Sequence, residues 1–395
     1  FHSALWILQH CYSLKTFDEI LNFSFLKDEF LIARNAYNFI KVLRFITNLF
    51  TKNNKLDFET QIEIAKRTSS GKLNQSNKAL VEKMMAKYYE HAHYISHFNT
   101  LIYQFFEEKK YSFKNKKGLY RNGSKVGFAN VSLEENKELI FKVFLEIGNN
   151  KKINAVDVQT SIMLKKNSSL IDNNFRKNAH FASQFLNILK SKYNLSSILK
   201  AMRDLGLLQR YIPEFSSVVG QMQFDLFHIY TVDEHTFKVV RNMRQMKIFN
   251  QKGFELEHEL INKLPKIELL FIAGLFHDLG KGKGGDHSKI GSKACYKFSR
   301  RLGLSKVDSN LTSWLVEKHL EMSSVSQKKD ISEQETIKDF AETVMNSERL
   351  DYLYLLTIND IRATNPSLWN GWKHQLLREL YSKTRLKINK EPIQT

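Results

Sequence analysis

The sequence predicts an all-α fold with a small irregular or hairpin segment. Only 4 prolines and 16 glycines occur among the 395 residues, so few residues interrupt regular structure. Hydrophobic residues make up 42% of the chain, which suits a globular protein with a sizeable core. One face of residues 27–50 carries apolar residues at alternating steps of four and three: Ile32, Ala36, Phe39, Leu43, Ile46 and Phe50.

Helical periodicity continues through residues 78–106 and is then interrupted. The interruption covers residues 108–130, where short alternating segments surround Lys-Gly and Asn-Gly pairs at 117–118 and 122–123. Such pairs are turn signals, so we expect a loop or a small hairpin in this region. Helical periodicity resumes at about Glu134 and persists to the end of the chain.

The composition changes again around Asp204, where a segment contains glycine, proline and histidine. We therefore predict a helical domain over residues 1–190 and a second domain over residues 191–395.

The net charge and the cysteine content limit the binding partners and the cellular compartment that we expect for this protein. The net charge of +19 permits binding to nucleic acid, nucleotides or an acidic protein. The lysines are spread without a stripe, and no aromatic RNA-stacking pattern accompanies them, so nucleic-acid binding receives little support. Two cysteines, Cys11 and Cys295, fit a reducing compartment, and no apolar run is long enough to span a membrane. We expect a cytoplasmic protein that does not enter a membrane.

Side chains that bind metals gather in the second half of the chain. They are His228, His235, His277, Asp278, Asp286, His287, His319 and Asp360. Neutral imidazole and carboxylate together suit Mn²⁺, Fe²⁺, Zn²⁺ or Mg²⁺, of which Mg²⁺ prefers the carboxylates.

The segment FIAGLFHDLGKGKGGDHS, residues 271–288, is the most informative part of this set. An apolar helical run ends at His277 and Asp278, which lie roughly 100° apart on a helix. A metal above the helix end can take one ligand from each. The glycines that follow allow close approach of the backbone, and Lys281 and Lys283 add positive charge, a combination that suits a phosphate.

The remaining candidates also have ordinary structural explanations. His235 follows a polar helix start and His319 ends an amphipathic helix, so either can be a core or surface histidine. Asp360 interrupts the apolar stretch LLTINDIRAT, where it can pair with Arg362. A buried carboxylate is costly unless it is paired or bound to a metal. The joint order His, His-Asp, His, Asp favours a metal site over these separate explanations.

This order resembles the HD superfamily, whose members are all-α, metal-dependent phosphohydrolases. The segments VGQMQFDLFHIYTVDEHT, LFHDLGKGKGGDHS, WLVEKHLEMS and DIRATNPSLWNGWKHQLLRELY extend the likeness over about residues 200–395. Together they resemble the HD domain of the bifunctional uridylyltransferase/uridylyl-removing enzymes, which modify the nitrogen-regulatory protein PII. Residues 1–190 resemble the helical region that follows the nucleotidyltransferase domain in that family, with VEKMMAKYYEHAHYISHFN as the clearest segment.

The resemblance implies a set of metal ligands. His235, His277, Asp278 and Asp360 would be the core ligands. His287 and His319 would complete a second metal position, as in two-metal members of the superfamily. The metal would be Mg²⁺ or Mn²⁺ in the first place, with Fe²⁺ and Zn²⁺ as other possibilities.

The resemblance also implies catalytic and substrate-binding roles. Catalysis would involve His277 and Asp278 together with Lys281, which would steady the phosphate or the attacking water. His228 and Lys283 would lie near the substrate. The expected reaction releases UMP from the tyrosine of uridylylated PII.

Two alternatives stay open: an HD phosphohydrolase of a free nucleotide or alarmone, and a non-catalytic module that binds PII. The sequence also departs from the family, because it contains no Asp-x-Asp arrangement of the kind found in the transferase domain. We expect a piece of a longer protein, in which a transferase domain precedes this region and glutamine-sensing ACT domains follow it.

Overall fold

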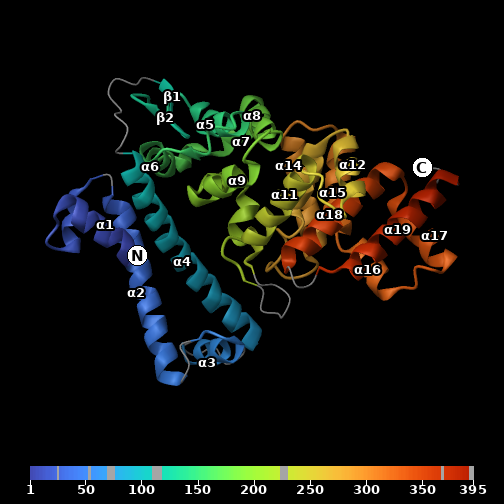
Figure 1. The fold of residues 1–395 in the computed structure, drawn as a ribbon, viewed down its shortest axis with the longest axis horizontal. Coiled ribbons are helices and arrows are strands. Elements are labelled where there is room, and N and C mark those ends of the chain that lie inside the picture. The colour runs from blue at the N-terminus through green and yellow to red at the C-terminus, as the bar shows by residue number, and fades with distance from the viewer. Residues whose placement is uncertain are drawn as a thin grey trace.

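The computed structural model is almost entirely helical, which confirms the all-α prediction (Figure 1). It describes residues 1–24, 26–51, 55–68, 76–108, 118–222, 230–365 and 369–390. Within these residues, no helix combines the length and the apolar character that a membrane span requires.

The N-terminal part consists of helices that pack around two long ones. Its elements are α1 (His2–Tyr12), η1 (Phe17–Asn22), α2 (Lys27–Phe50), α3 (Phe58–Thr68) and α4 (Asn77–Glu108). The bounds of α2 and α4 confirm the helices expected over residues 27–50 and 78–106. Figure 1 shows both helices extending away from the rest of the molecule, with α3 at their far end. Apolar residues of α1, α2 and α4, among them Leu5, Phe30 and Phe98, form a separate core here.

The expected hairpin is confirmed in the described part of residues 108–130. Strands β1 (Gly118–Asn122) and β2 (Lys125–Ala129) pair antiparallel, with Asn122 opposite Lys125, and β3 (Ala155–Val156) adds to β2 in parallel. The carboxylate of Glu108, at the end of α4, accepts hydrogen bonds from the Lys125 ammonium and the Val158 amide, each at 3.1 Å. This buried carboxylate therefore fixes the long helix against the sheet.

The middle of the chain is built from short helices around the hairpin. They are α5 (Leu139–Asn149), α6 (Val158–Lys166), η2 (Ser168–Leu170), α7 (Asn173–Lys177), α8 (Ala179–Leu189), α9 (Leu195–Asp204), α10 (Leu207–Tyr211) and η3 (Pro213–Ser217). Asp157 begins α6 by accepting a hydrogen bond from the Thr160 amide at 2.8 Å, as a helix N-cap does.

The remaining helices form the part of the molecule that holds the candidate site. They are α11 (Val232–Ile248), α12 (Glu255–Lys263), α13 (Ile267–Phe276), α14 (His287–Arg301), α15 (Lys306–Lys318), α16 (Glu321–Lys328), α17 (Gln334–Val344), α18 (Ser347–Thr364) and α19 (Gly371–Lys390). Helix α13 lies at the centre, because every residue from Glu268 to Phe276 is buried. The largest apolar core extends from Val126 to Ile388. The division of the chain near residue 190 stays a prediction.

Candidate metal centre

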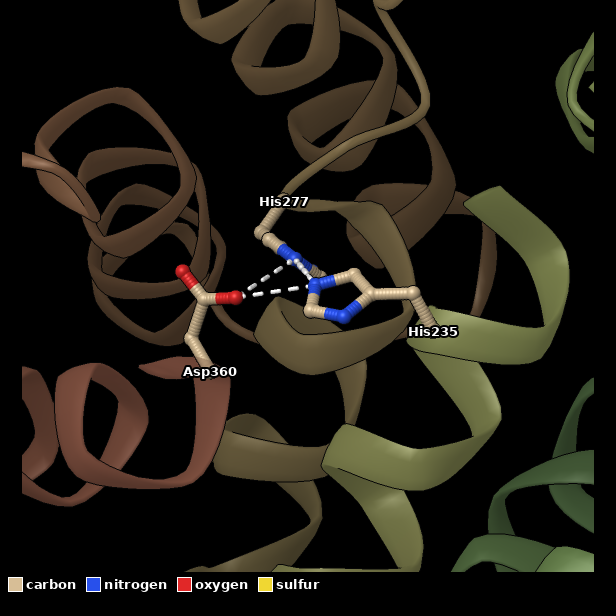
Figure 2. Close-up of side chains that lie close together, drawn as sticks. All are labelled: His235, His277 and Asp360. Atoms are coloured by element: carbon tan, nitrogen blue, oxygen red, sulfur yellow. Dashed lines mark hydrogen bonds and ion pairs between the residues drawn. The ribbon is translucent and has the colours of Figure 1, made fainter. Parts of the chain in front are cut away.

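Two buried histidines and a partly buried aspartate meet around one point (Figure 2). His235 comes from α11, His277 follows the last residue of α13, and Asp360 comes from α18. Asp360 Oδ1 lies 2.9 Å from His235 Nε2 and 3.5 Å from His277 Nε2. The two Nε2 atoms are 3.1 Å apart. Residues separated by 125 positions in the sequence thus direct their donor atoms to one place.

A second group lies beside the first and consists of Asp278, His287 and His319. Asp278 connects the groups because its two oxygens face different ways. Its Oδ2 lies 3.2 Å from His277 Nε2 and 3.6 Å from His235 Nε2. Its Oδ1 lies 3.9 Å from Nε2 of both His287 and His319. The structure therefore brings together all six side chains that the sequence predicts as metal ligands.

Two helix ends orient their histidines in the same way. His277 and His319 each follow directly after a helix, α13 and α15. The Nδ1–H of each donates to the carbonyl three residues earlier, Gly274 at 2.8 Å and Val316 at 2.7 Å. With the proton fixed on Nδ1, the Nε2 lone pair of each ring is directed into the site, as a metal ligand requires.

The start of α14 places His287. Asp286 caps this helix by accepting hydrogen bonds from the amides of Ser288 and Lys289, at 3.0 and 3.3 Å. The loop that precedes α14 passes close to the start of this helix. A Cβ on Gly280 of the loop would lie 2.1 Å from the His287 carbonyl oxygen. Only glycine fits at that position, so the loop after Asp278 allows His287 to approach the other ligands.

The donor set fits a divalent metal ion. His277, Asp278 and His319 are at most 2% exposed, so water does not satisfy their polar atoms. His287 Nε2 is also buried and accepts or donates no hydrogen bond within the described part of the chain. Four imidazoles and two carboxylates in this arrangement provide two neighbouring sets of ligands, each able to hold one ion.

Strong electrostatic coupling sets the protonation of the group. Burial alone would lower the pKa of His277, but the carboxylates of Asp278 and Asp360 raise it to about 10. Burial would raise the pKa of Asp278, yet His277 and Lys281 hold it well below its usual range. Burial and the charge of His277 lower the pKa of His319 to about 4. A second proton, on Nε2 of His277, thus offsets the carboxylate charge. A metal ion that binds this atom would take the place of that proton.

The other predicted site residues differ in their placement. The Lys281 ammonium lies 2.7 Å from Asp278 Oδ2, so it belongs to the group. Lys283 is exposed in the glycine-rich loop, and its predicted place near the substrate stays a prediction. Arg362 donates to the Gln251 side chain at 3.2 Å and stacks on Phe254. His228 lies outside the described residues, so its predicted role stays a prediction.

The sequence interpretation missed an ionic network that holds the first turn of α11. Arg203 of α9, whose side chain is 7% exposed, binds Asp233 and Glu234 at 2.6 Å each. Asp233 also accepts a hydrogen bond from the Gly220 amide at 3.1 Å. These two acidic residues directly precede His235, so the network fixes the turn that carries a ligand. The only sequence signal was the Asp-Glu pair in TVDEHT.

Comparisons with known proteins agree with this architecture. Three family models match the chain: GlnD PII-uridylyltransferase over residues 1–103, the third domain of uridylyltransferase GlnD over 129–211, and the HD domain over 232–351. The HD match begins and ends in α11 and α18 and contains five of the six grouped side chains. It identifies this region with the metal-dependent phosphohydrolase domain that the sequence resembles.

Similar curated proteins carry the name bifunctional uridylyltransferase/uridylyl-removing enzyme. The protein from Azotobacter vinelandii strain DJ is 36% identical over 398 residues, and that from Ectopseudomonas mendocina is 37% identical over 396. The protein from Pseudomonas fluorescens is 35% identical over 395 residues. Each alignment covers 97% of this chain and 44% of the relative, so the chain spans less than half the length of these proteins. Over 97% of its length the chain is therefore similar to bifunctional uridylyltransferase/uridylyl-removing enzymes, and its residues 232–351 match the HD domain.

Proposed function

We propose that this chain carries the uridylyl-removing activity, which hydrolyses the phosphodiester between UMP and a tyrosine of PII. The observation that carries the proposal is Asp278, whose two oxygens face two neighbouring groups of buried and partly buried side chains that can bind a metal. A site of this kind suits the hydrolysis of a phosphate ester. The name shared by the relatives points to a uridylyl group as the part that is removed, and the family model that matches residues 1–103 points to PII as its carrier.

The six side chains would together hold two metal ions. His235, His277 and Asp360 would hold one ion, and His287 and His319 a second, with Asp278 between them. When bound, Mg²⁺ or Mn²⁺ acidifies a water molecule and offsets charge on the phosphoryl oxygens. Lys281 would hold Asp278 in place and add positive charge beside the phosphate.

The reaction consumes one water molecule. Its oxygen forms a new bond to phosphorus, and the bond between phosphorus and the tyrosine oxygen breaks. The tyrosine leaves as a phenolate, which departs more readily than an alkoxide because the pKa of tyrosine is about 10. The products are UMP and unmodified PII, and we expect the reaction to take place in the cytoplasm.

Release of UMP from uridylylated PII tests the proposal. The chain is incubated with Mn²⁺ or Mg²⁺, and UMP is quantified by chromatography beside a panel of free nucleotides and a guanosine tetraphosphate-type alarmone. We expect release from uridylylated PII at a higher kcat/KM than any turnover of the panel. Faster hydrolysis of a free nucleotide would instead favour a nucleotide phosphohydrolase. Bound metal without turnover of any substrate would favour a non-catalytic PII-binding module.

A further inference from the structure

A large trough lies between α4 and the short helices that precede the HD domain. Its volume is about 1260 Å³, and α4 provides one wall while α7, α9, α10 and the start of α11 provide the others. Figure 1 shows α4 passing obliquely beside α9. None of the six grouped metal-binding side chains lines the trough, so it is a separate feature of the molecule.

The lining of the trough includes residues that directly precede a metal ligand. Thr231, Asp233 and Glu234 line it, and His235 follows in α11. Arg203 also lines the trough and binds both acidic residues. A molecule seated in the trough would therefore contact the turn that carries His235.

The charge that the trough offers to a ligand is mainly positive. Six basic and four acidic side chains line it. Three of the acidic ones, Asp204, Asp233 and Glu234, are already bound by Arg203 within the wall itself. The fourth, Glu90, accepts a hydrogen bond from the Tyr94 hydroxyl at 2.9 Å.

Four cations lie on the two opposing walls. Lys83 and Lys87 are exposed, one turn apart on α4, and Arg210 is exposed on α10. None of these three forms an ion pair with another residue that the structure describes. Arg176 of α7 donates to the Arg210 carbonyl at 2.8 Å and to the Asn173 side chain. These four side chains remain available to meet negative charge on a ligand.

We propose that this trough docks an acidic, extended segment of the uridylylated protein, and this inference rests on the proposed function. The trough exceeds the range of about 300–1,000 Å³ typical of small-molecule pockets. Its cations are divided between α4 on one side and α7 and α10 on the other, so they match charges spread along a chain. A single phosphate group would need them to converge. Complementary charge of this kind improves the encounter and orientation of protein partners.

Charge reversal on α4 tests the docking. In the double variant Lys83→Glu and Lys87→Glu, we expect KM for the uridylylated protein to rise about tenfold or more, with kcat unchanged. Hydrolysis of a small phosphodiester, the p-nitrophenyl ester of UMP, should not change, because that substrate needs no docking surface. A matched control is Lys293→Glu with Lys297→Glu, an exposed pair with the same spacing on α14.

Several results would contradict the docking. One is an unchanged KM in the α4 variant, and another is an equal rise in KM in the α14 control. A third is an α4 variant with normal circular dichroism that loses as much activity toward the small ester as toward the uridylylated protein. A variant that only weakens inhibition by free UMP would indicate a nucleotide in the trough. If the α4 variant does not fold, Arg210→Glu on the opposite wall provides the same test.

Direct binding separates this inference from the proposed function. If the wild-type chain hydrolyses neither substrate, the proposed function fails. Binding of the uridylylated protein is then measured by calorimetry at low and high salt. Docking predicts an affinity that falls with salt in the wild type and falls less in the α4 variant. Absence of binding, or binding that is identical in the variant, would overturn the docking proposal.

Discussion

Asp278 is the residue on which the candidate site depends most. Its Oδ2 faces His277 and also lies 2.7 Å from the Lys281 ammonium, while its Oδ1 faces His287 and His319. The His277–Asp278 pair was predicted as part of a metal site because it falls within the joint order His, His-Asp, His, Asp, which favours a metal over separate structural explanations. The separate directions of the two carboxylate oxygens were not predictable, since they depend on how α14 and α15 pack.

The two groups of ligands predict two ions in each chain. In His319→Asn, the second group loses one imidazole while His235, His277 and Asp360 stay in place. We expect this variant to bind one ion fewer than the wild type, measured by inductively coupled plasma mass spectrometry after dialysis against Mn²⁺. His180→Asn, which changes an exposed histidine of α8, is the matched control. An equal ion content in all three proteins would contradict the second group.

At the scale of elements, polar contacts between helices decide how the ligands are presented. The bounds of α2 and α4 and the hairpin followed from periodicity and turn residues, which are local signals. Contacts between distant elements left no such signal. Arg203 on α9 is an example, because nothing near it in the sequence shows that Asp233 lies beside it.

The Arg203 network predicts a link between α9 and metal binding. Arg203→Met leaves the buried carboxylate of Asp233 without its cation, which costs about 3–5 kcal/mol of unfolding free energy. Because the turn that carries His235 loosens, we expect metal affinity to fall about 10–100-fold. Urea denaturation and metal titration measure the two effects. Arg203→Lys keeps the charge and should recover part of both. Unchanged metal affinity in Arg203→Met would show that the network only stabilises the fold.

A second network joins α12, α18 and α19 and predicts a pH dependence. Burial alone would raise the pKa of Glu257, but hydrogen bonds from His374, Arg378 and Tyr354 lower it to about 2. Because this pKa is lower in the folded chain than in the unfolded one, the ionised carboxylate stabilises the fold at neutral pH. That stability is lost as the pH falls from about 4.5 toward 2.

Comparison of Glu257→Gln with the wild type measures this contribution. We expect the variant to be about 3 kcal/mol less stable than the wild type at neutral pH. This difference in unfolding free energy should shrink as the pH falls from about 4.5 toward 2. Chemical denaturation at several pH values gives both quantities. Glu259→Gln is the control on the same helix, because Glu259 is exposed and forms its ion pair with Lys263 one turn away. A difference between Glu257→Gln and wild type that does not vary with pH would contradict the assignment.

At the scale of the whole molecule, the chain combines a long-helix part with the HD domain, and the trough lies where they meet. The sequence indicated both parts through their resemblance to one family. It did not indicate the trough, because the positions of α4 and α10 relative to each other depend on packing over more than a hundred residues. The sequence alignment with the Azotobacter vinelandii relative covers 97% of this chain and therefore includes both parts.

Metal-dependent release of UMP by the wild type and by Asp278→Ala tests most directly whether this site removes the uridylyl group. Both proteins are stripped of metal, checked for folding by circular dichroism, and then titrated with Mn²⁺ in the presence of uridylylated PII. We expect release by the wild type to rise with bound metal and to stop with chelator. In a folded Asp278→Ala, we expect release to fall by a factor of about 100 or more. Full activity in the variant, or in the presence of chelator, would show that these residues do not carry the reaction.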